Sequence, residues 1–303
     1  MSETSPPDRE RVIELEGRPL DLRATLAPLG KMAARFTEGG WWTAVRTPQG
    51  AATVGISRLG RAQVMVRVWG VGSDWICARV EGWLGMADRP ESFLTDHPLV
   101  KRIHHFNPGF RFGATGLVSE ALWAAIVAQK VTGREAARSM GALVRKWGEQ
   151  APGPQVGVRL LPHPRRLASL GYYDLHPLGL ERKRAVTLLR AAQWYDRIEK
   201  TADLPSRQAR SFLEQLPGIG EWTSARTVAV SHGDADAVAV GDYHLKNVVA
   251  WHLTGRPRGT DEEMMDLLEP FRPHRGRVVR LLEKAGKAPQ FGPRMPLRDF
   301  RYQ

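Results

Sequence analysis

The spacing of apolar residues changes character part way along the chain. Residues 62–70 alternate, with three valines on one side of the run, which predicts a half-buried strand. Residues 47–50, Thr-Pro-Gln-Gly, are typical of a turn and separate two further extended runs, 41–46 and 51–58. We therefore expect residues 11–110 to form an N-terminal α/β domain built on an antiparallel sheet.

From about residue 117 the apolar residues recur every three or four positions, which predicts helices. The proline- and glycine-rich segment 151–164 indicates a connection between helices. We expect a disordered tail at 1–10, a helical core at 111–285 and a C-terminal tail at 286–303, which together give an α+β fold. The helical segments are expected at 120–130, 133–147, 182–195, 206–215, 221–232, 243–253, 261–270 and 275–285.

Charge and cysteine content narrow the classes of function. The chain has 303 residues, with 44 Lys+Arg against 32 Asp+Glu and a formal net charge of +12. Such a surface suits a polyanion, most commonly nucleic acid, although RNA or an anionic membrane would fit charge alone. Cys77 is the only cysteine, which excludes an internal disulfide and a four-thiolate cluster. No run of about 18 apolar residues occurs, so we expect a cytoplasmic, nucleoid-associated protein and no membrane partner.

A glycine-rich turn separates two of the predicted helices. Its two glycines permit a tight turn, and Ile219 between them can fill the space between the helices. The helix that begins at Glu221 has unpaired first-turn amides, which can bind a phosphate oxygen. A turn in any helical protein is the alternative for Gly-x-Gly alone. The predicted hairpin spans 206–232, and its DNA-binding candidates are Leu216, Pro217, Gly218, Ile219, Gly220, Glu221 and Thr223.

Asp242 follows the hairpin by about twenty residues, in the string Val-Gly-Asp-Tyr, just before another amphipathic helix. Alone, it would be interpreted as a helix N-cap. The hairpin and Gly-Asp-Tyr together resemble the helix-hairpin-helix (HhH-GPD) superfamily of DNA glycosylases, most closely its alkylated-base, 3-methyladenine DNA glycosylase II branch. Segments 124–131 and 179–185 resemble other parts of that core, and the resemblance covers about 115–285.

The resemblance implies two helical subdomains with a damaged base flipped between them, double-stranded DNA as the partner and a monomer. The aspartate of the family falls on Asp242, which would stabilise positive charge at the sugar C1′. Relatives with lyase activity carry lysine where this chain has Trp222. The expected activity is therefore monofunctional release of alkylated purines, such as 3-methyladenine and 7-methylguanine, without an iron–sulfur cluster.

Five residues are candidates for the base pocket or for a wedge that fills the gap left by the base. Trp222 and Tyr243 could either line the pocket or pack in the core. The resemblance places a pocket-lining aromatic where Arg226 stands, and an apolar wedge just after Gln129, where the chain has Lys130. The candidates are Gln129, Lys130, Trp222, Arg226 and Tyr243.

Backbone and phosphate contacts complete the predicted site. Lys246 and Arg275 are candidate phosphate contacts, although either could be a solvated charge. The resemblance also implies a monovalent cation, sodium or potassium, held at the hairpin by backbone carbonyls. Those carbonyls would belong to Glu214, Leu216 and Gly218, and no other cofactor is expected.

Two rival functions remain open at this point. A damage-sensing DNA-binding protein could keep the hairpin without catalysis, but it has no need of a carboxylate at Asp242. A glycosylase for another lesion class, such as an oxidised-purine enzyme with lyase activity, would need a nucleophilic amine where Trp222 stands.

Overall fold

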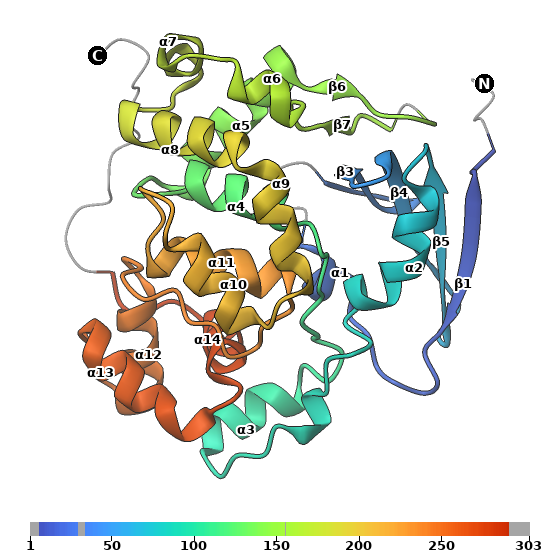
Figure 1. Ribbon diagram of the computed structural model, residues 1–303. Coiled ribbons are helices and arrows are strands. Elements are labelled where there is room, and N and C mark those ends of the chain that lie inside the picture. The colour runs from blue at the N-terminus through green and yellow to red at the C-terminus, as the bar shows by residue number, and fades with distance from the viewer. Residues whose placement is uncertain (1–5, 30–33, 155, 291–303) are drawn as a thin grey trace.

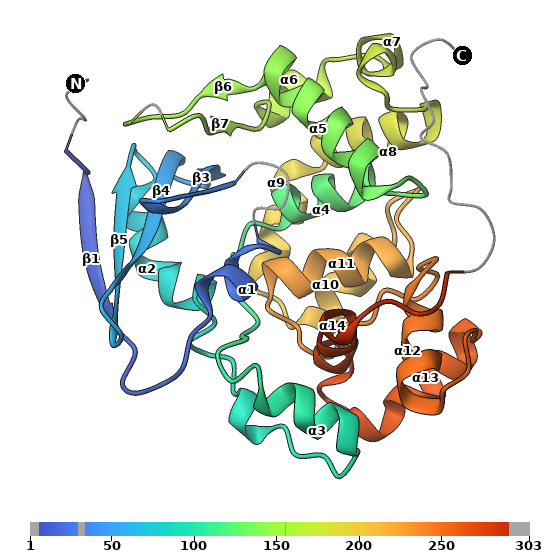
Figure 2. The same ribbon diagram turned by 180° about the vertical axis from the view of Figure 1, so that it is seen from behind.

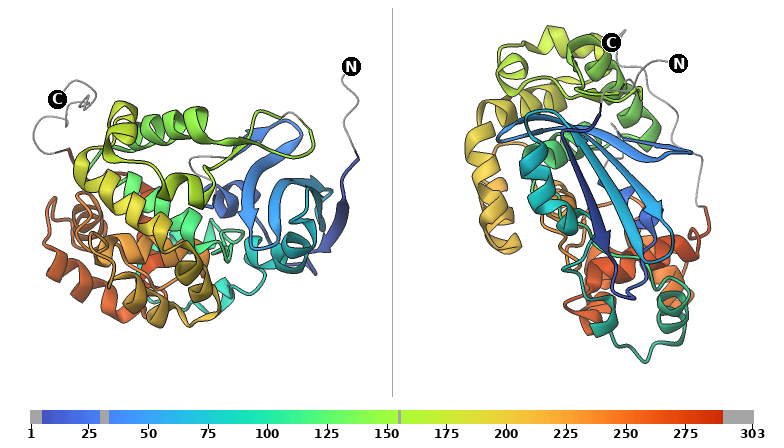
Figure 3. Two further views of the ribbon diagram at one scale, coloured as in Figure 1. Left: turned by 45° about the horizontal axis from the view of Figure 1, so that its top comes forward. Right: turned by 90° about the vertical axis from the view of Figure 1, so that its right-hand side faces the viewer.

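The computed structural model describes residues 6–29, 34–154 and 156–290. Its N-terminal part is an antiparallel sheet with strand order β1-β5-β4-β3-β2. The sheet stands beside the helices in Figures 1 and 2, and Figure 3 shows its twist. The strands are β1 (Arg9–Glu14), β2 (Arg35–Thr37), β3 (Gly40–Thr47), β4 (Gly50–Leu59) and β5 (Gln63–Trp69).

One face of this sheet forms a hydrophobic core. Val64, Val66 and Val68 are fully buried, as the alternation in 62–70 predicts. They pack in the same cluster as Ile76 and Trp83 of α2 (Ser73–Trp83). The expected half-buried strand is confirmed, and the turn at 47–50 joins β3 to β4.

The opposite face of β3 is covered from the other half of the chain. A small hairpin of β6 (Glu149–Gln150) and β7 (Arg159–Leu160) packs there, burying Ala44 against Leu160. This hairpin lies partly within 151–164, which the sequence predicts only as a connection. Its strands are two residues long, too short for a periodic signal.

The helices predicted from the sequence begin and end within three residues of the expected positions, and the short helices at 164–168, 172–175 and 195–199 were not predicted. The N-terminal 110 residues also contain α1 (Leu22–Leu26) and α3 (Pro98–His105), and 3₁₀ turns lie at Pro90–Ser92, His176–Leu178, Lys200–Asp203 and Glu269–Phe271. The remaining helices are α4 (Val118–Val127), α5 (Gly133–Trp147), α6 (Pro164–Ala168), α7 (Tyr172–Leu175), α8 (Arg182–Gln193), α9 (Tyr195–Glu199), α10 (Ser206–Leu213), α11 (Glu221–Ser231), α12 (Leu245–Thr254), α13 (Asp261–Leu268) and α14 (Arg275–Ala285).

Helix α4 is the centre of the larger helical cluster. It packs against α8 and α11 (Figure 1), and Leu122 and Ile126 are fully buried there. Helix α5 begins with a capping box in which Thr132 and Glu135 each accept a hydrogen bond from the other's backbone amide. The predicted α+β fold is thus present, with an antiparallel sheet followed by a mainly helical core.

A second helical cluster contains α12, α13 and α14, together with α3 from the N-terminal half. Val100 and Ile103 of α3 are buried in the same core as Val278 of α14. An ion pair between Arg277 and Asp88, both buried, joins the same segments. By packing, the segment around α3 therefore goes with the C-terminal helices, whereas the sequence prediction places it in the domain 11–110.

The chain ends differ in part from the predicted tails. Arg9 and Glu10 belong to β1, because their backbone pairs with β5 and Glu10 forms an ion pair with Arg67. The first five residues of the predicted tail 1–10, and 291–303 of the predicted tail 286–303, lie outside the described residues. In the described ranges, no helix has both the length and the apolar character needed to cross a membrane.

Candidate active site

The predicted hairpin joins α10 to α11 in a tight turn. Leu216 and Ile219 are buried in the main helical core, whereas Pro217, Gly218 and Gly220 are exposed. Gly218 has a φ of +99°, in the left-handed region that favours glycine. The two apolar side chains anchor the turn, so its backbone is presented to solvent.

The N-terminus of α11 is open to a ligand. No side chain caps this helix within the described structure, and both Gly220 and Glu221 are exposed. Amides in the first turn of a helix have no partner within the helix and attract anions. Glu221 lies beside them but pairs with Arg210 at 3.6 Å, which offsets its negative charge. The turn can therefore accept a phosphate oxygen.

Gln129, a candidate for the base pocket or wedge, braces this turn. Its Nε2 donates to the Gly218 carbonyl and to Thr223 Oγ1, both at 2.9 Å. Sequence position alone could not indicate this role, because the contact joins the end of α4 to a turn 89 residues away. Lys130 follows it, is exposed, and has a φ of +53°, which is uncommon for a residue other than glycine.

Two of the three carbonyls implied as cation ligands already accept hydrogen bonds. The Leu216 carbonyl accepts the Ile219 amide at 3.0 Å, and the Gly218 carbonyl accepts Gln129. The carboxylate of Glu214 accepts the Ser224 hydroxyl at 2.5 Å. A carbonyl oxygen has a second lone pair, so a sodium or potassium ion at this turn stays a prediction.

Asp242 lies in the loop before α12, where three donors hold its carboxylate. Oδ1 accepts the amides of His244 at 2.9 Å and Leu245 at 3.3 Å, and Oδ2 accepts Trp222 Nε1 at 2.9 Å. The backbone contacts satisfy amides at the start of α12, although the N-cap residue of this helix is His244 and Asp242 lies two residues before it. The indole contact connects this carboxylate to α11, directly after the hairpin.

The loop that carries Asp242 is itself held in place. Gly241, with a φ of +84°, donates its amide to Asp261 Oδ1 at 3.1 Å. Asp261 also pairs with Lys246, at 3.2 Å from Oδ2 to Nζ. Lys246, a predicted phosphate contact, therefore neutralises a carboxylate of the protein and positions the aspartate loop.

Arg275, the other predicted phosphate contact, is also paired. It is largely buried and binds Asp236 with two nitrogens, at 3.0 and 2.6 Å. A bidentate pair of this kind fixes the start of α14. The partner lies 39 residues away, so only the tertiary structure reveals the pairing.

Trp222 and Arg226 are stacked side by side on α11. The guanidinium carbon of Arg226 lies 4.9 Å from the centre of the Trp222 ring. Burial lowers the pKa of Arg226, and the negative charge of Asp242 partly opposes this effect. Its Nε is buried without a hydrogen-bond partner among the described residues. Tyr243 is 67% exposed and contacts the His244 ring, so it does not pack in the core.

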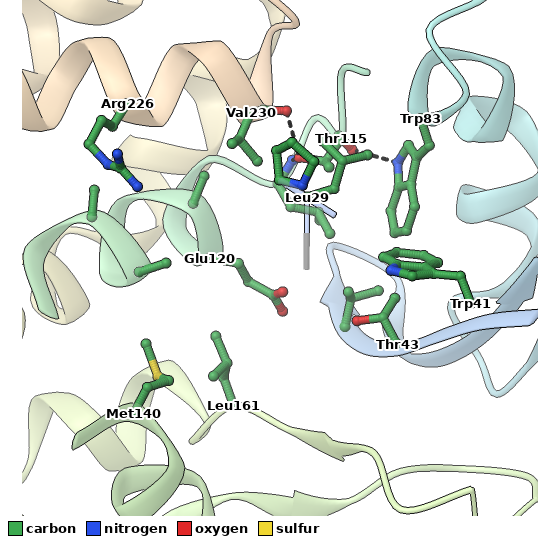
Figure 4. A pocket seen from close by; sticks show the side chains of 16 residues that line it. Leu29, Trp41, Thr43, Trp83, Thr115, Glu120, Met140, Leu161, Arg226 and Val230 are labelled. Atoms are coloured by element: carbon green, nitrogen blue, oxygen red, sulfur yellow. Dashed lines mark hydrogen bonds between the residues drawn. The ribbon is translucent and has the colours of Figure 1, made fainter. Parts of the chain in front are cut away.

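A cavity extends from Arg226 between the helices and the sheet. Figure 4 shows Arg226 on one side, Trp41 and Thr43 of β3 on the other, and Glu120 of α4 between them. Burial raises the pKa of Glu120 to about 8, although the Arg46 amide donates to it at 2.8 Å. Sequence analysis missed Glu120, because a single acid in a helix is indistinguishable from a solvated charge.

The comparisons with known proteins agree with this architecture. The family described as HhH-GPD superfamily base excision DNA repair protein matches residues 123–273, about half of the chain. The chain therefore belongs to the HhH-GPD superfamily, to which its sequence resemblance points. No curated protein sequence matches it.

Two solved structures show the same fold over most of the chain. The 3-methyladenine DNA-glycosylase from Archaeoglobus fulgidus has 17% identity and a TM-score of 0.73, over 90% of this chain and 97% of that one. The Clostridium acetobutylicum 8-oxoguanine glycosylase/lyase, in complex with double-stranded DNA, has 14% identity and a TM-score of 0.69, over 93% and 96%. At these identities the likeness concerns the fold.

Gly218→Ala is expected to destabilise the protein by about 2–4 kcal/mol. An added Cβ would lie 2.2 Å from Thr187 Oγ1, on a backbone that non-glycine residues avoid. Gly220→Ala is the matched control, because its backbone is extended and a Cβ there has nothing within 4 Å. Urea unfolding of both variants measures the difference. Equal losses would mean that the turn does not need glycine at position 218.

Proposed function

We propose that this protein is a DNA glycosylase without lyase activity, which hydrolyses the N-glycosidic bond of a damaged purine in duplex DNA. The observation that carries the proposal is the Asp242 carboxylate, held by three donors and joined to the hairpin helix through Trp222. The open N-terminus of α11 supports double-stranded DNA as the partner. So does the superfamily, whose members repair DNA by base excision.

The carboxylate supplies electrostatic stabilisation. As the C1′–N bond breaks, its electron pair leaves with the base and positive charge develops at C1′, which Asp242 stabilises. Water then adds its oxygen to C1′ and loses one proton, leaving an abasic site. That proton passes to solvent when the departing base was cationic and balances the protonation of the departing base when it was neutral. The indole of Trp222 only donates a hydrogen bond and has no amine for a Schiff base. This supports hydrolysis without strand cleavage.

Two lesion classes are candidates within this reaction. The sequence resemblance favours alkylated purines of the 3-methyladenine and 7-methylguanine type, which already carry positive charge and leave without strong acid assistance. Arg226, a half-buried residue whose Nε is buried without a partner among the described residues, favours a second class, neutral oxidised or deaminated purines. A non-catalytic damage sensor is disfavoured, because binding alone gives no reason to hold a carboxylate at Asp242.

The test is base release from duplexes that carry one lesion each, with chromatographic detection of the free base. We expect release, with the DNA strand intact until alkali cleaves the abasic site. Borohydride should trap no covalent protein–DNA adduct. A trapped adduct would overturn the assignment as a hydrolase, and binding to damaged DNA without release of any base would support a damage sensor.

A further inference from the structure

We propose that Arg226 determines lesion specificity, admitting a neutral purine that presents a carbonyl oxygen to its guanidinium and disfavouring a cationic alkylated base. This inference rests on the proposed function, because it concerns the base that the same site releases. It applies to oxidised and deaminated purines alike, since both classes share the added carbonyl.

Arg226 lies close to the predicted reacting group. Arg226 stacks on Trp222, and Trp222 Nε1 binds the Asp242 carboxylate, so the guanidinium is one side chain away from the predicted reacting group. Arg226 also lines the cavity between α4, α11 and β3 (Figure 4). Asp242 and Trp222 are not among the described residues that line this cavity, so Arg226 is the side chain that connects it to the Trp222–Asp242 pair. A base held against Asp242 and directed toward the cavity therefore meets the guanidinium.

The positive charge of Arg226 disfavours a cationic base. Arginine stays protonated in proteins, and a fixed positive charge in a partly desolvated site repels a second cation strongly. A cationic base would gain most from the face of an aromatic ring. One face of Trp222 already holds the Arg226 guanidinium. The arrangement therefore lowers the affinity of the site for 3-methyladenine or 7-methylguanine.

Two residues that line the cavity have buried N–H donors that a carbonyl oxygen could satisfy. In the described part of the chain, neither Arg226 Nε nor Trp41 Nε1 has a hydrogen-bond partner, although both atoms are buried at this cavity. A buried donor without a partner is costly, and a carbonyl oxygen satisfies it.

Glu120 completes this set of groups. Burial raises its pKa to about 8, so near neutral pH it is mainly the uncharged acid, which can donate and accept hydrogen bonds. Arg46, whose amide donates to Glu120, and Glu199 are the charged neighbours that act on it. A neutral base with carbonyl and N–H groups on its edge matches this lining, and Glu120 is the only acid among the described residues that line the cavity.

The experiment compares single-turnover base release from four duplexes, two neutral lesions (8-oxoguanine, hypoxanthine) and two cationic ones (3-methyladenine, 7-methylguanine). Arg226→Met should lower release of the neutral base about ten- to hundredfold, the range for losing a hydrogen bond to a charged group. It should also raise release of the cationic bases. Arg226→Lys keeps the charge without the planar fork, so it should lose neutral-base release without gaining cationic-base release.

Arg67→Met is the matched control, because Arg67 is an exposed arginine of β5 that pairs with Glu10. It should leave the ratio of neutral to cationic release unchanged. Equal changes on all four duplexes in Arg226→Met would overturn the specificity role while leaving the glycosylase assignment intact. Absence of release from every duplex by the wild type would instead remove the proposed function, and this inference with it. Thermal unfolding checks that each variant is folded.

Discussion

Asp242→Asn is expected to lower the single-turnover rate of base release roughly a hundred- to thousandfold, the usual cost of removing one electrostatic contact to a transition state. The substitution removes the negative charge and the oxygen that accepts Trp222 Nε1. Asparagine keeps an oxygen that can accept the amides of His244 and Leu245, so the contacts at the start of α12 remain. Stability should fall by only about 1 kcal/mol, for the lost indole hydrogen bond, and affinity for duplex DNA should change little.

Asp242→Ala separates the two roles of this side chain. It removes the acceptor of all three hydrogen bonds as well as the charge, so it should lose activity and also about 2 kcal/mol of stability. Asp74→Asn is the control for general loss of negative charge, because Asp74 is exposed on α2 and pairs with Arg9 at the surface. Base release, filter-binding to duplex DNA and urea unfolding measure the three effects. Full activity in Asp242→Asn would disprove the catalytic assignment.

Glu120→Gln should remove a large pH dependence of stability. Burial raises the pKa of Glu120 from 4.5 to about 8, so the folded state favours the protonated acid. Its stabilising contribution is complete below pH 4.5 and is lost progressively as the pH rises to about 8. At about 1.4 kcal/mol per pKa unit, this loss approaches 5 kcal/mol. Glutamine stays neutral and can still accept the Arg46 amide, so the variant should be the more stable protein at pH 9.

Urea unfolding at pH 5, 7 and 9 tests this expectation. Glu199 is also buried, and burial raises its pKa, so the variant should keep a weaker slope of the same sign. Glu81→Gln is the control, because Glu81 is an exposed acid that pairs with Arg11. If the free energy of unfolding depends on pH in the same way in the wild type and in Glu120→Gln, the pKa of Glu120 is the same in the folded and the unfolded protein.

Positions whose signal is local were predictable from the sequence. The alternation in 62–70 places three valines on one face of a strand, and burial follows once that face meets α2. Likewise, Gly218 and Ile219 specify a turn, because one tolerates a left-handed backbone and the other can be buried. The contacts of Asp242 Oδ1 are equally local, because it accepts amides only two and three residues away.

Residues whose role depends on a distant partner were not predictable in the same way. Lys246 and Arg275 resemble free phosphate contacts in sequence, but Asp261 and Asp236 pair with them in the fold. Gln129 is a pocket or wedge candidate in sequence, and only the fold shows that it braces the hairpin. The sequence does not show which distant residue a charged or amide side chain will contact. Its partner is known only from the tertiary structure, which brings the two segments together.

The sequence by itself therefore determined the order of the longer helices and the hairpin, because periodicity, turn chemistry and helix starts act over a few residues. The superfamily followed from the resemblance of the hairpin and Gly-Asp-Tyr to a known family. Only the tertiary structure decided the environment of the site. It brought Trp222 to Asp242, stacked Arg226 on Trp222, and enclosed Glu120 between α4 and β3. Desolvation and pairing set the charge and hydrogen-bonding capacity of these groups, and both depend on segments that are far apart in the chain.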